Sequence, residues 1–181
     1  MRLPLPTFVA AAALAVLLGA CQGRPAPTPT TAAPALADNY FKVSFNGQTR
    51  TYADVSFGDG QLGALKSLHI AAGSTADAYL TLDVFGRQAG TFPYRQALSQ
   101  YEGVSQAEYK IGGKVFASYK ALVCPTSAGY YSTQGQVVIT EYVPGQRLRG
   151  TFAGALLDQD DPDQCSKQAT PFSGEFCLTK N

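Results

Sequence analysis

Several residue types are scarce in this 181-residue chain: it has no tryptophan, one histidine and one methionine, and only 15% of its residues are charged. The formal net charge is +1, so no excess of basic residues favours binding to nucleic acid. A single histidine, His69, and cysteines without CxxC spacing exclude the common zinc motifs. We therefore expect no nucleic-acid partner and no cofactor.

Long apolar runs are missing too, and the N-terminal run Phe8–Leu18 is too short to span a bilayer comfortably. Arg2 precedes this run, and the small residues Gly19 and Ala20 follow it. A positive start, a short apolar centre and small residues at the end are typical of secretory signals. We expect residues 1–20 to be a signal peptide.

The end of this segment, Leu18-Gly19-Ala20-Cys21, resembles the lipobox of bacterial lipoproteins. The resemblance implies that cleavage leaves Cys21 first, with its thiol diacylated and its amine acylated. Each buried CH₂ contributes about 0.8 kcal/mol, so several acyl chains together give a stable membrane anchor. The resemblance thus predicts a lipoprotein of the bacterial envelope, in the outer membrane and facing the periplasm or the surface. The alternative is an ordinary secretory signal in which Cys21 is incidental.

Residues 21–38 are expected to form the lipidated cysteine and a tether. Gln22–Ala37 is rich in proline, alanine and threonine, so it cannot build a core and favours extended polyproline II. From residue 39 onward aromatic and β-branched residues and spaced glycines take over. The remaining stretch, 39–181, is long enough for one domain with its own core.

This C-terminal region predicts an all-β fold. Apolar residues alternate with polar ones in about eight to ten short segments, and no segment keeps a 3.6-residue period. The pattern favours an antiparallel β-sandwich, with a closed or partly open, lipocalin-like β-barrel as the alternative.

Three turn signals predict hairpins. Pro144-Gly145 joins two strands within Gly135–Leu157, and we expect Tyr142 to lie opposite Arg147. Asn46-Gly47 and Gly112-Gly113 mark two more hairpins. The first of these would place Tyr52 opposite Phe41, and the second would join Gln106–Ile111 to Lys114–Val123. We call the hairpin around Pro144-Gly145 the central hairpin. One of its faces is expected to be buried, and this face is made of Val137, Ile139, Leu148, Phe152, Gly154 and Leu156.

Other segments are less regular. Asp54–Gly63 is broken by glycines and is expected to be a loop, and its glycines lack the strand-to-helix context of a phosphate-binding loop. Arg95–Val104 leaves room for a helical turn.

Three cysteines follow the tether: Cys124, Cys165 and Cys177. An odd number in an oxidising compartment predicts one disulfide and one remaining thiol. All three pairings stay open at this point.

The C-terminal part resembles an uncharacterised family of small bacterial lipoproteins. Their last strands follow the patterns VxITxY, xxGTFxG and GxF, which stand here at 137–142, 149–154 and 174–176. An Asn-Gly turn followed by an aromatic residue, and Gly90-Thr91-Phe92, agree with it. The resemblance implies a β-sandwich-like domain on a lipid anchor and carries no activity.

One segment has the composition of a metal site. Asp158, Asp160, Asp161 and Asp163 could offer oxygen ligands to Ca²⁺. The segment lacks the glycine and the glutamate of an EF-hand loop, and the alternative is a solvated acidic loop.

Three other groups of residues have the composition of catalytic or binding sites. Ser67, His69 and an aspartate could form a hydrolase triad, although no Gly-x-Ser-x-Gly elbow occurs. A glycosidase-like carboxylate pair could come from Asp54, Asp59, Asp83 and Glu102. Tyr130-Tyr131 could form a stacking or sugar-binding platform.

Taken together, these features predict a non-enzymatic, lipid-anchored envelope protein with a binding or structural role and a protein or small-molecule partner. A lipocalin-like carrier of a small apolar ligand is one alternative, and an envelope hydrolase is another.

Overall fold

The computed structural model describes residues 39–74, 78–97 and 101–180, so the predicted signal peptide, Cys21 and the tether lie outside the described residues. The described part is built of β-strands without an α-helix, and it therefore holds no helix that could cross a membrane. The strands are β1 (Tyr40–Phe45), β2 (Gln48–Tyr52), β3 (Val55–Leu62), β4 (Leu65–Ser74), β5 (Ala78–Val84), β6 (Gly90–Pro93), β7 (Ser105–Ile111), β8 (Lys114–Ala117), β9 (Tyr119–Cys124), β10 (Ser127–Ser132), β11 (Gly135–Val143), β12 (Arg147–Asp158) and β13 (Ala169–Thr179).

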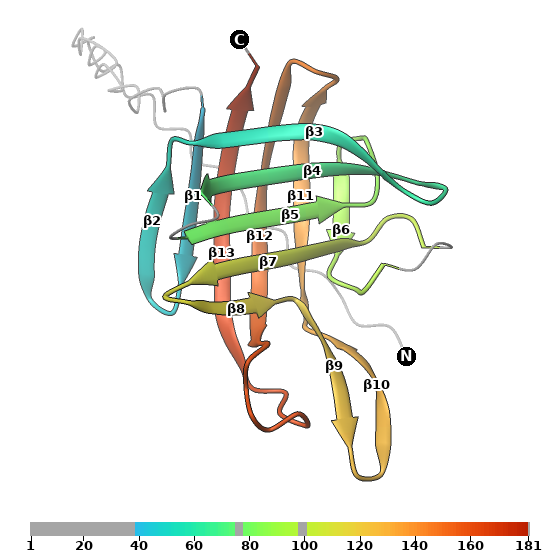
Figure 1. Ribbon diagram of the computed structural model, residues 1–181. Helices are drawn as coiled ribbons and strands as arrows, with labels where there is room; N and C mark the ends of the chain where they lie inside the picture. Colours follow the sequence, from blue (N-terminus) through green and yellow to red (C-terminus); the bar gives the residue numbers. More distant parts are fainter. Residues whose placement is uncertain (1–38, 75–77, 98–100, 181) are drawn as a thin grey trace, which may run out of the picture. The chain divides into compact units, whose positions relative to one another are not determined.

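Eleven of these strands form one sheet that folds over on itself (Figure 1). We call β2, β1, β13, β12, β11 and β6 the back layer, and β8, β7, β5, β4 and β3 the front layer, whose strands run across those of the back layer. Strand β12 connects the two. Its first part pairs with β11 as far as Gly154, and its last residues, Leu157 and Asp158, pair with β8.

The space between the layers is filled by aromatic rings. The ring of Phe152 lies 5.2 Å from that of Phe41 and 4.8 Å from that of Phe172. Tyr109 of the front layer is 6.2 Å from Phe172, and all four side chains are at most 2% exposed. The prediction of an antiparallel all-β fold is confirmed. The layers pack as in a crossed sandwich, while the continuous sheet gives the domain the curl of a partly open barrel.

The central hairpin has the predicted buried face but a partly different register. Val143, not Tyr142, lies opposite Arg147, and Tyr142 lies opposite Leu148. A bulge at Thr140 inserts one extra residue, and beyond it the predicted register returns, with Val137 opposite Phe152. The predicted pairing of Tyr142 is therefore wrong, but only near the turn. The turn holds three residues, which shifts the register by one, and the bulge at Thr140 shifts it back.

Two other hairpins are confirmed by their turns. Tyr52 lies opposite Phe41, and Asn46 and Gly47 both have positive φ angles, 48° and 74°. Gly112 and Gly113 between β7 and β8 also have positive φ, 60° and 77°. Two successive residues with positive φ make the tight turn that matches the twist of paired strands.

The expected loop at Asp54–Gly63 is wrong, because Val55–Leu62 is the edge strand β3. One of its glycines faces a small space, since a Cβ on Gly60 would come within 2.7 Å of Ser67 Oγ. The Arg87 guanidinium also donates a 2.7 Å hydrogen bond to the Gly60 carbonyl. Pairing with β4 and this contact compensate for the low strand propensity of glycine.

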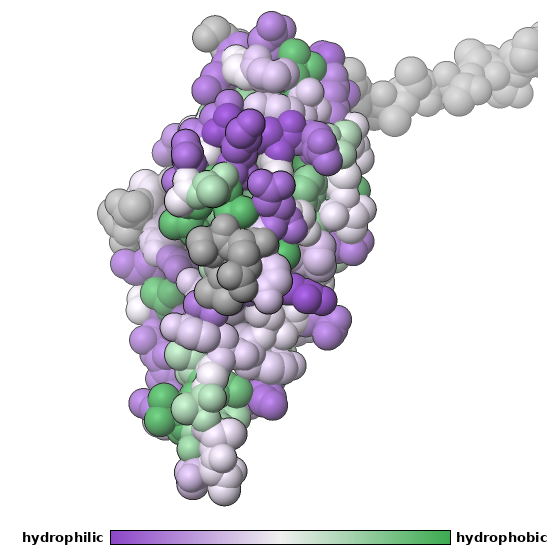
Figure 2. Space-filling model, turned by 90° about the vertical axis from the view of Figure 1, so that its right-hand side faces the viewer, coloured by the Kyte–Doolittle hydropathy of each residue, from purple (hydrophilic) through white to green (hydrophobic). Residues whose placement is uncertain are grey.

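The expected strand Lys114–Val123 is two strands, because the chain leaves the main sheet at the buried Ser118. Ser118 Oγ accepts a 2.9 Å hydrogen bond from the amide of Ala107. Beyond it, β9 and β10 form a separate two-stranded hairpin. Figure 2 shows hydrophobic residues gathered at the lower end of the molecule, where this hairpin lies. On β9, Val123 has 61% of its surface exposed.

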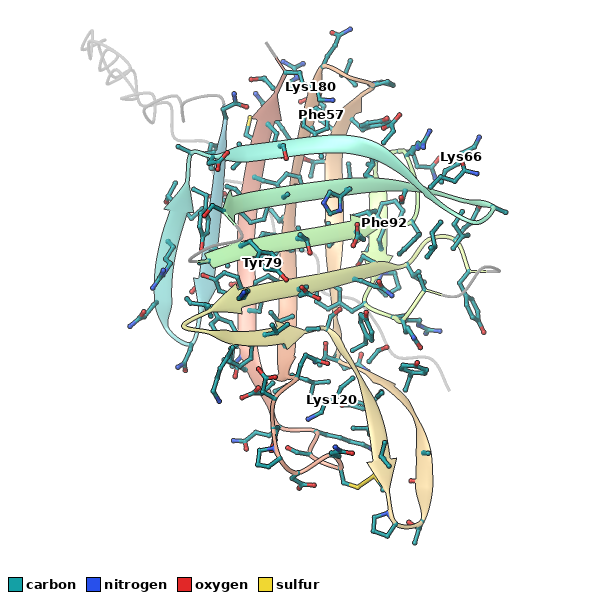
Figure 3. All side chains as sticks on the ribbon, in the orientation of Figure 1. Phe57, Lys66, Tyr79, Phe92, Lys120 and Lys180 are labelled. Carbon is teal, nitrogen blue, oxygen red and sulfur yellow. A yellow bond between two sulfur atoms is a disulfide. The ribbon has the colours of Figure 1, made fainter. Side chains whose placement is uncertain are left out.

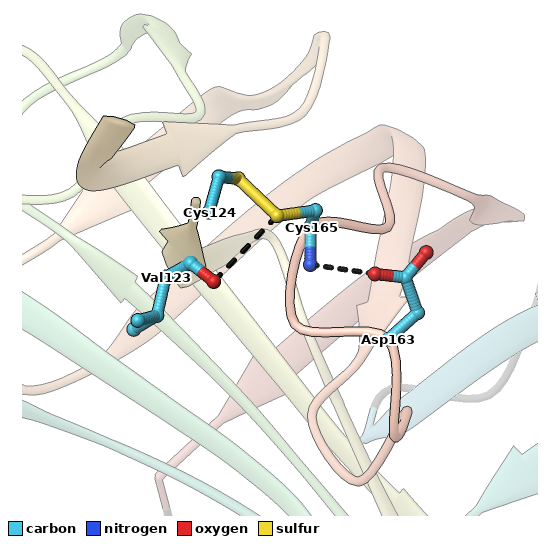
Figure 4. The surroundings of a disulfide bond; sticks show 4 residues. All are labelled: Val123, Cys124, Asp163 and Cys165. Atoms are coloured by element: carbon cyan, nitrogen blue, oxygen red, sulfur yellow. Dashed lines mark hydrogen bonds between the residues drawn. A yellow bond between two sulfur atoms is a disulfide. The ribbon is translucent and has the colours of Figure 1, made fainter. Parts of the chain in front are cut away.

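The hairpin is tied to the segment after β12 by a disulfide. Cys124 and Cys165 are joined, with a Cα–Cα distance of 5.2 Å (Figure 4). Cys165 makes two further contacts. Its backbone amide donates a hydrogen bond to Asp163 Oδ1, and its sulfur lies 3.6 Å from the Val123 carbonyl oxygen. Of the three open pairings the structure has Cys124–Cys165, and Cys177 lies buried in β13 outside the bridge.

Candidate functional site

A cleft of roughly 360 Å³ opens where the end of β6, the β10–β11 connection and Tyr101 meet. Three tyrosines line it: Tyr94, Tyr101 and Tyr130. We call it the tyrosine cleft. Its volume lies at the lower end of the range of small-molecule sites, about 300–1,000 Å³.

Tyr94 forms the buried side of the tyrosine cleft and is only 3% exposed. Its ring occupies the space that side chains on Gly135 and Gly154 would need, since a Cβ there would lie 2.5 and 2.6 Å from Tyr94 Cε2. The Tyr94 hydroxyl has no hydrogen-bond partner among the described residues. Burial raises the pKa of this hydroxyl far above its ordinary value, so it stays protonated at neutral pH.

Tyr101 and Tyr130 form the accessible side of the cleft. They are 45% and 64% exposed, while nine other aromatic residues of the described part are buried. In the described part of the chain, four large apolar side chains are this exposed, and two of them line this one cleft. An exposed aromatic ring at the mouth of a concavity is available for stacking against a ligand.

Polar side chains border the rings. Arg95, Gln96, Ser132 and Gln134 all line the cleft. The Gln96 amide donates a 3.0 Å hydrogen bond to Ser132 Oγ, and the Arg95 amide donates one of 3.0 Å to the Ser105 carbonyl. These bonds fix the backbone that carries the polar side chains of the cleft.

The hairpin that carries Tyr130 is held firmly at its base. Thr133, which is 5% exposed, donates through Oγ1 to the Ala155 carbonyl at 2.7 Å. Lys120 is also 5% exposed, and its Nζ donates to the Asp158 carbonyl at 3.0 Å (Figure 3). Together with the Cys124–Cys165 bridge, these contacts limit movement of one wall of the cleft.

The Tyr130-Tyr131 platform expected from the sequence is divided by the structure. Adjacent residues of a strand point to opposite faces. Tyr130 lines the cleft, and the Tyr131 ring instead lies under Lys167, with Nζ 4.9 Å from its centroid. The partners of Tyr130 are Tyr94 and Tyr101, which sequence reasoning missed. Tyr101 lies in the less regular segment Arg95–Val104 and Tyr94 lies just before it, so no sequence signal linked them to Tyr130.

The structure gives His69 an acidic partner but does not bring Ser67 to it, so the expected hydrolase triad is not assembled. His69 Nδ1 lies 2.7 Å from Asp83 Oδ1, on the outer surface of the front layer. The hydrogen bond to Asp83 raises the pKa of His69, and partial burial opposes this rise. Ser67, by contrast, is 6% exposed and its Oγ faces Gly60.

Two of the four carboxylates expected to offer a glycosidase-like pair are held by other side chains. Asp59 is engaged by Tyr142, whose hydroxyl donates at 2.8 Å, and by Arg87 at 3.5 Å. Asp83 is engaged by His69. On the same outer face, the Tyr79 hydroxyl donates to Glu108 (Figure 3). Asp59 and Asp83 thus each have their own neutralising or donating neighbour.

The calcium hypothesis for Asp158, Asp160, Asp161 and Asp163 is not supported. In residues 101–180 and the other described ranges, no three acidic, histidine or cysteine side chains converge as metal ligands. The aspartates bind their own loop: Asp158 accepts from the Asp160 amide and Asp161 from the Asp163 amide. Asp158 also pairs with Lys114 at 2.8 Å, and this hydrogen bond lowers the pKa of its carboxyl. The acidic residues therefore shape the loop that carries Cys165.

The opening between the two layers is a second hollow. It measures roughly 220 Å³ and has a floor of Phe45, Tyr109 and Phe116. Behind it the interlayer space is occupied by the aromatic core, so this opening is shallow. Its volume is below the range of about 300 Å³ and more that ligand pockets usually have.

Comparisons with known proteins add no relative: no protein-family model, no curated protein and no solved structure matches the chain.

Proposed function

We propose that this chain is a lipid-anchored protein of the bacterial envelope whose β-domain binds a saccharide in the tyrosine cleft. The observation that carries the proposal is the joint exposure of Tyr101 and Tyr130 at a concavity bordered by Arg95, Gln96 and Gln134.

The chemistry of a sugar ring fits this arrangement. One face of a pyranose carries C–H groups, which pack against an aromatic ring, and its edge carries hydroxyls that both donate and accept hydrogen bonds. Tyrosine offers an apolar face and a polar rim with little conformational entropy to lose on binding. Glutamine, serine and arginine at the border supply the donors and acceptors that fix ring orientation.

The lipid anchor in this proposal comes from the resemblance of Leu18-Gly19-Ala20-Cys21 to a lipobox, and the tether places the binding domain at a distance from the membrane. The carrier alternative draws little support from a core filled by rings such as Phe152 and Phe172. The hydrolase alternative draws little from Ser67, which is buried beside Gly60.

Two measurements test the two parts of the proposal. The anchor is tested by producing the full chain and the Cys21→Ser variant in bacteria and comparing their masses and detergent partitioning. We expect acylation and partitioning into detergent for the first chain, and neither for the variant. An unmodified Cys21 in the mature protein would refute the anchor.

Binding is tested by applying the full mature chain in detergent to an array of immobilised glycans. We expect retention on a subset of glycans and loss of retention in Tyr130→Ala, which removes an exposed ring without touching the core. Tyr131→Ala is the matched control, because its ring contacts Lys167 outside the cleft. Equal retention of both variants, or no retention of the parent chain, would refute saccharide binding at this site.

A further inference from the structure

We infer that the tyrosine cleft selects saccharides that carry a carboxylate, and that Arg95 is the residue that determines this preference. This inference rests on the proposed saccharide binding and adds the charge of the ligand.

Arg95 is the one charged side chain among the described residues that line the tyrosine cleft. None of those lining residues is an aspartate or glutamate, and Glu102, next to Tyr101 in sequence, is exposed and outside the lining. A cleft with one cation and no anion favours an anionic or neutral ligand over a cationic one.

Other arginines of the domain already form ion pairs with acidic residues. Arg87 pairs with Asp59 at 3.5 Å, and Arg147 donates through Nε to Glu141 at 2.8 Å. For Arg95, by contrast, the side chain is exposed and makes no hydrogen bond or ion pair with the described residues. A guanidinium without an internal partner keeps its fork of donors available for an external acceptor.

The backbone of Arg95 is fixed, so the guanidinium starts from a defined point at the border of the cleft. The Arg95 amide donates to Ser105, and Tyr94 beside it forms a bridge with the same residue. Ser105 is fully buried and its Oγ donates to the Phe92 carbonyl at 2.7 Å. The backbone at the base of the guanidinium is therefore anchored to the core.

A planar carboxylate matches a guanidinium by accepting two parallel N–H bonds. A hexuronic acid ring has the stacking face of a neutral hexose and replaces one hydroxymethyl group with a carboxylate. Stacked on Tyr101 or Tyr130, such a ring would place its carboxylate at the border where Arg95 lies. Hydrogen bonds to ionised groups are about twice as strong as neutral ones, so the acid form is preferred.

The test uses an array that presents each glycan in three matched forms: the neutral hexose, the hexuronic acid and the methyl ester of that acid. The proteins are the full mature chain in detergent and its Arg95→Gln, Arg95→Lys and Arg50→Gln variants. Arg50 is an exposed arginine at the hollow lined by Phe45 and Tyr109, and it serves as the matched control. Circular dichroism of each variant checks that the fold is retained.

We expect the acid forms to bind at least about tenfold more tightly than the esters, and Arg95→Gln to remove this difference. Arg95→Lys should keep part of it, because lysine keeps the charge without the fork. Raising the salt concentration should weaken binding of the acids and leave that of the esters unchanged.

Equal binding of acids and esters, or an unchanged preference in Arg95→Gln, would overturn the inference while leaving saccharide binding in place. Absence of binding to every form would overturn both proposals together. A preference lost equally in Arg50→Gln would show that overall charge, not Arg95, selects the acid.

Discussion

His69 of β4 and Asp83 of β5 lie opposite each other on neighbouring strands, and their side chains meet at 2.7 Å. The hydrogen bond to Asp83 raises the pKa of His69 above its ordinary value of 6.5. Protonated His69 is therefore favoured in the folded chain. Its contribution to the free energy of unfolding is fully present below about pH 6.5 and is lost as the pH rises through the folded-state pKa.

This pair gives the first prediction. Asp83→Asn should bring the pKa of His69 back toward 6.5, since the carboxylate that favours the charged form is gone. The loss of stability should be larger at pH 5.5 than at pH 8.5, and small, below about 1 kcal/mol, because both side chains are more than a third exposed. NMR titration of the single histidine measures the pKa directly, and an unchanged value in the variant would contradict the assignment.

The orphaned hydroxyl of Tyr94 gives the second prediction. A buried polar group without a partner costs about 1–3 kcal/mol, so Tyr94→Phe should raise the free energy of unfolding by about 1 kcal/mol. Tyr52→Phe is the matched control, because the Tyr52 hydroxyl is bonded to that of Tyr109 at 3.0 Å. It should lower stability. Urea unfolding followed by tyrosine fluorescence measures both, which the absence of tryptophan makes straightforward.

The Cys124–Cys165 disulfide gives the third prediction. The bridge closes a loop with a sequence separation of 41 residues. The chain-entropy estimate for a loop of that size is about 4 kcal/mol, so Cys124→Ser combined with Cys165→Ser should lower stability by up to that amount. Mild reduction of the parent chain should have the same effect, and the double variant should not respond to reductant. A response of the double variant would mean that another thiol is involved.

The same bridge connects stability to the tyrosine cleft. Tyr130 lies on β10, which pairs with the strand that ends at Cys124. If the bridge holds the hairpin in place, its loss should weaken binding of a retained glycan more than Tyr131→Ala does. Undiminished affinity in the double variant would show that Thr133 and Lys120 suffice to hold the cleft wall.

The strands were predictable from local patterns, whereas the candidate site was not. Alternation of apolar residues gave the buried face of the β11–β12 hairpin, and Asn46-Gly47 gave the first turn with its register. Local patterns failed at β3, where pairing with β4 and the Arg87 contact overcame the glycines. The tyrosine cleft joins Tyr94, Tyr101 and Tyr130 across different segments of the sequence. Only the tertiary fold brings them together, and no periodicity in the sequence records that contact.

Gly154 gives the last prediction, because it joins packing to binding. Its φ of 153° is unfavourable for other residues, and an added Cβ would lie 2.6 Å from Tyr94 Cε2 and 2.7 Å from the Gln134 carbonyl oxygen. Gly154→Ala should therefore lower the free energy of unfolding by about 1–3 kcal/mol and displace the Tyr94 ring. A displaced ring changes the buried side of the cleft, so glycan affinity should fall as well.

The matched control for this change is Gly129→Ala on β10. No atom lies within 4 Å of a Cβ added there. Without a clash, an alanine reduces the freedom of the unfolded chain, so its stability should be unchanged or slightly raised. Differential scanning calorimetry and the glycan array, applied to both variants, separate the two effects. Equal stability of the two variants would contradict the tight packing of Tyr94 against Gly154, and with it the account of how the cleft is built.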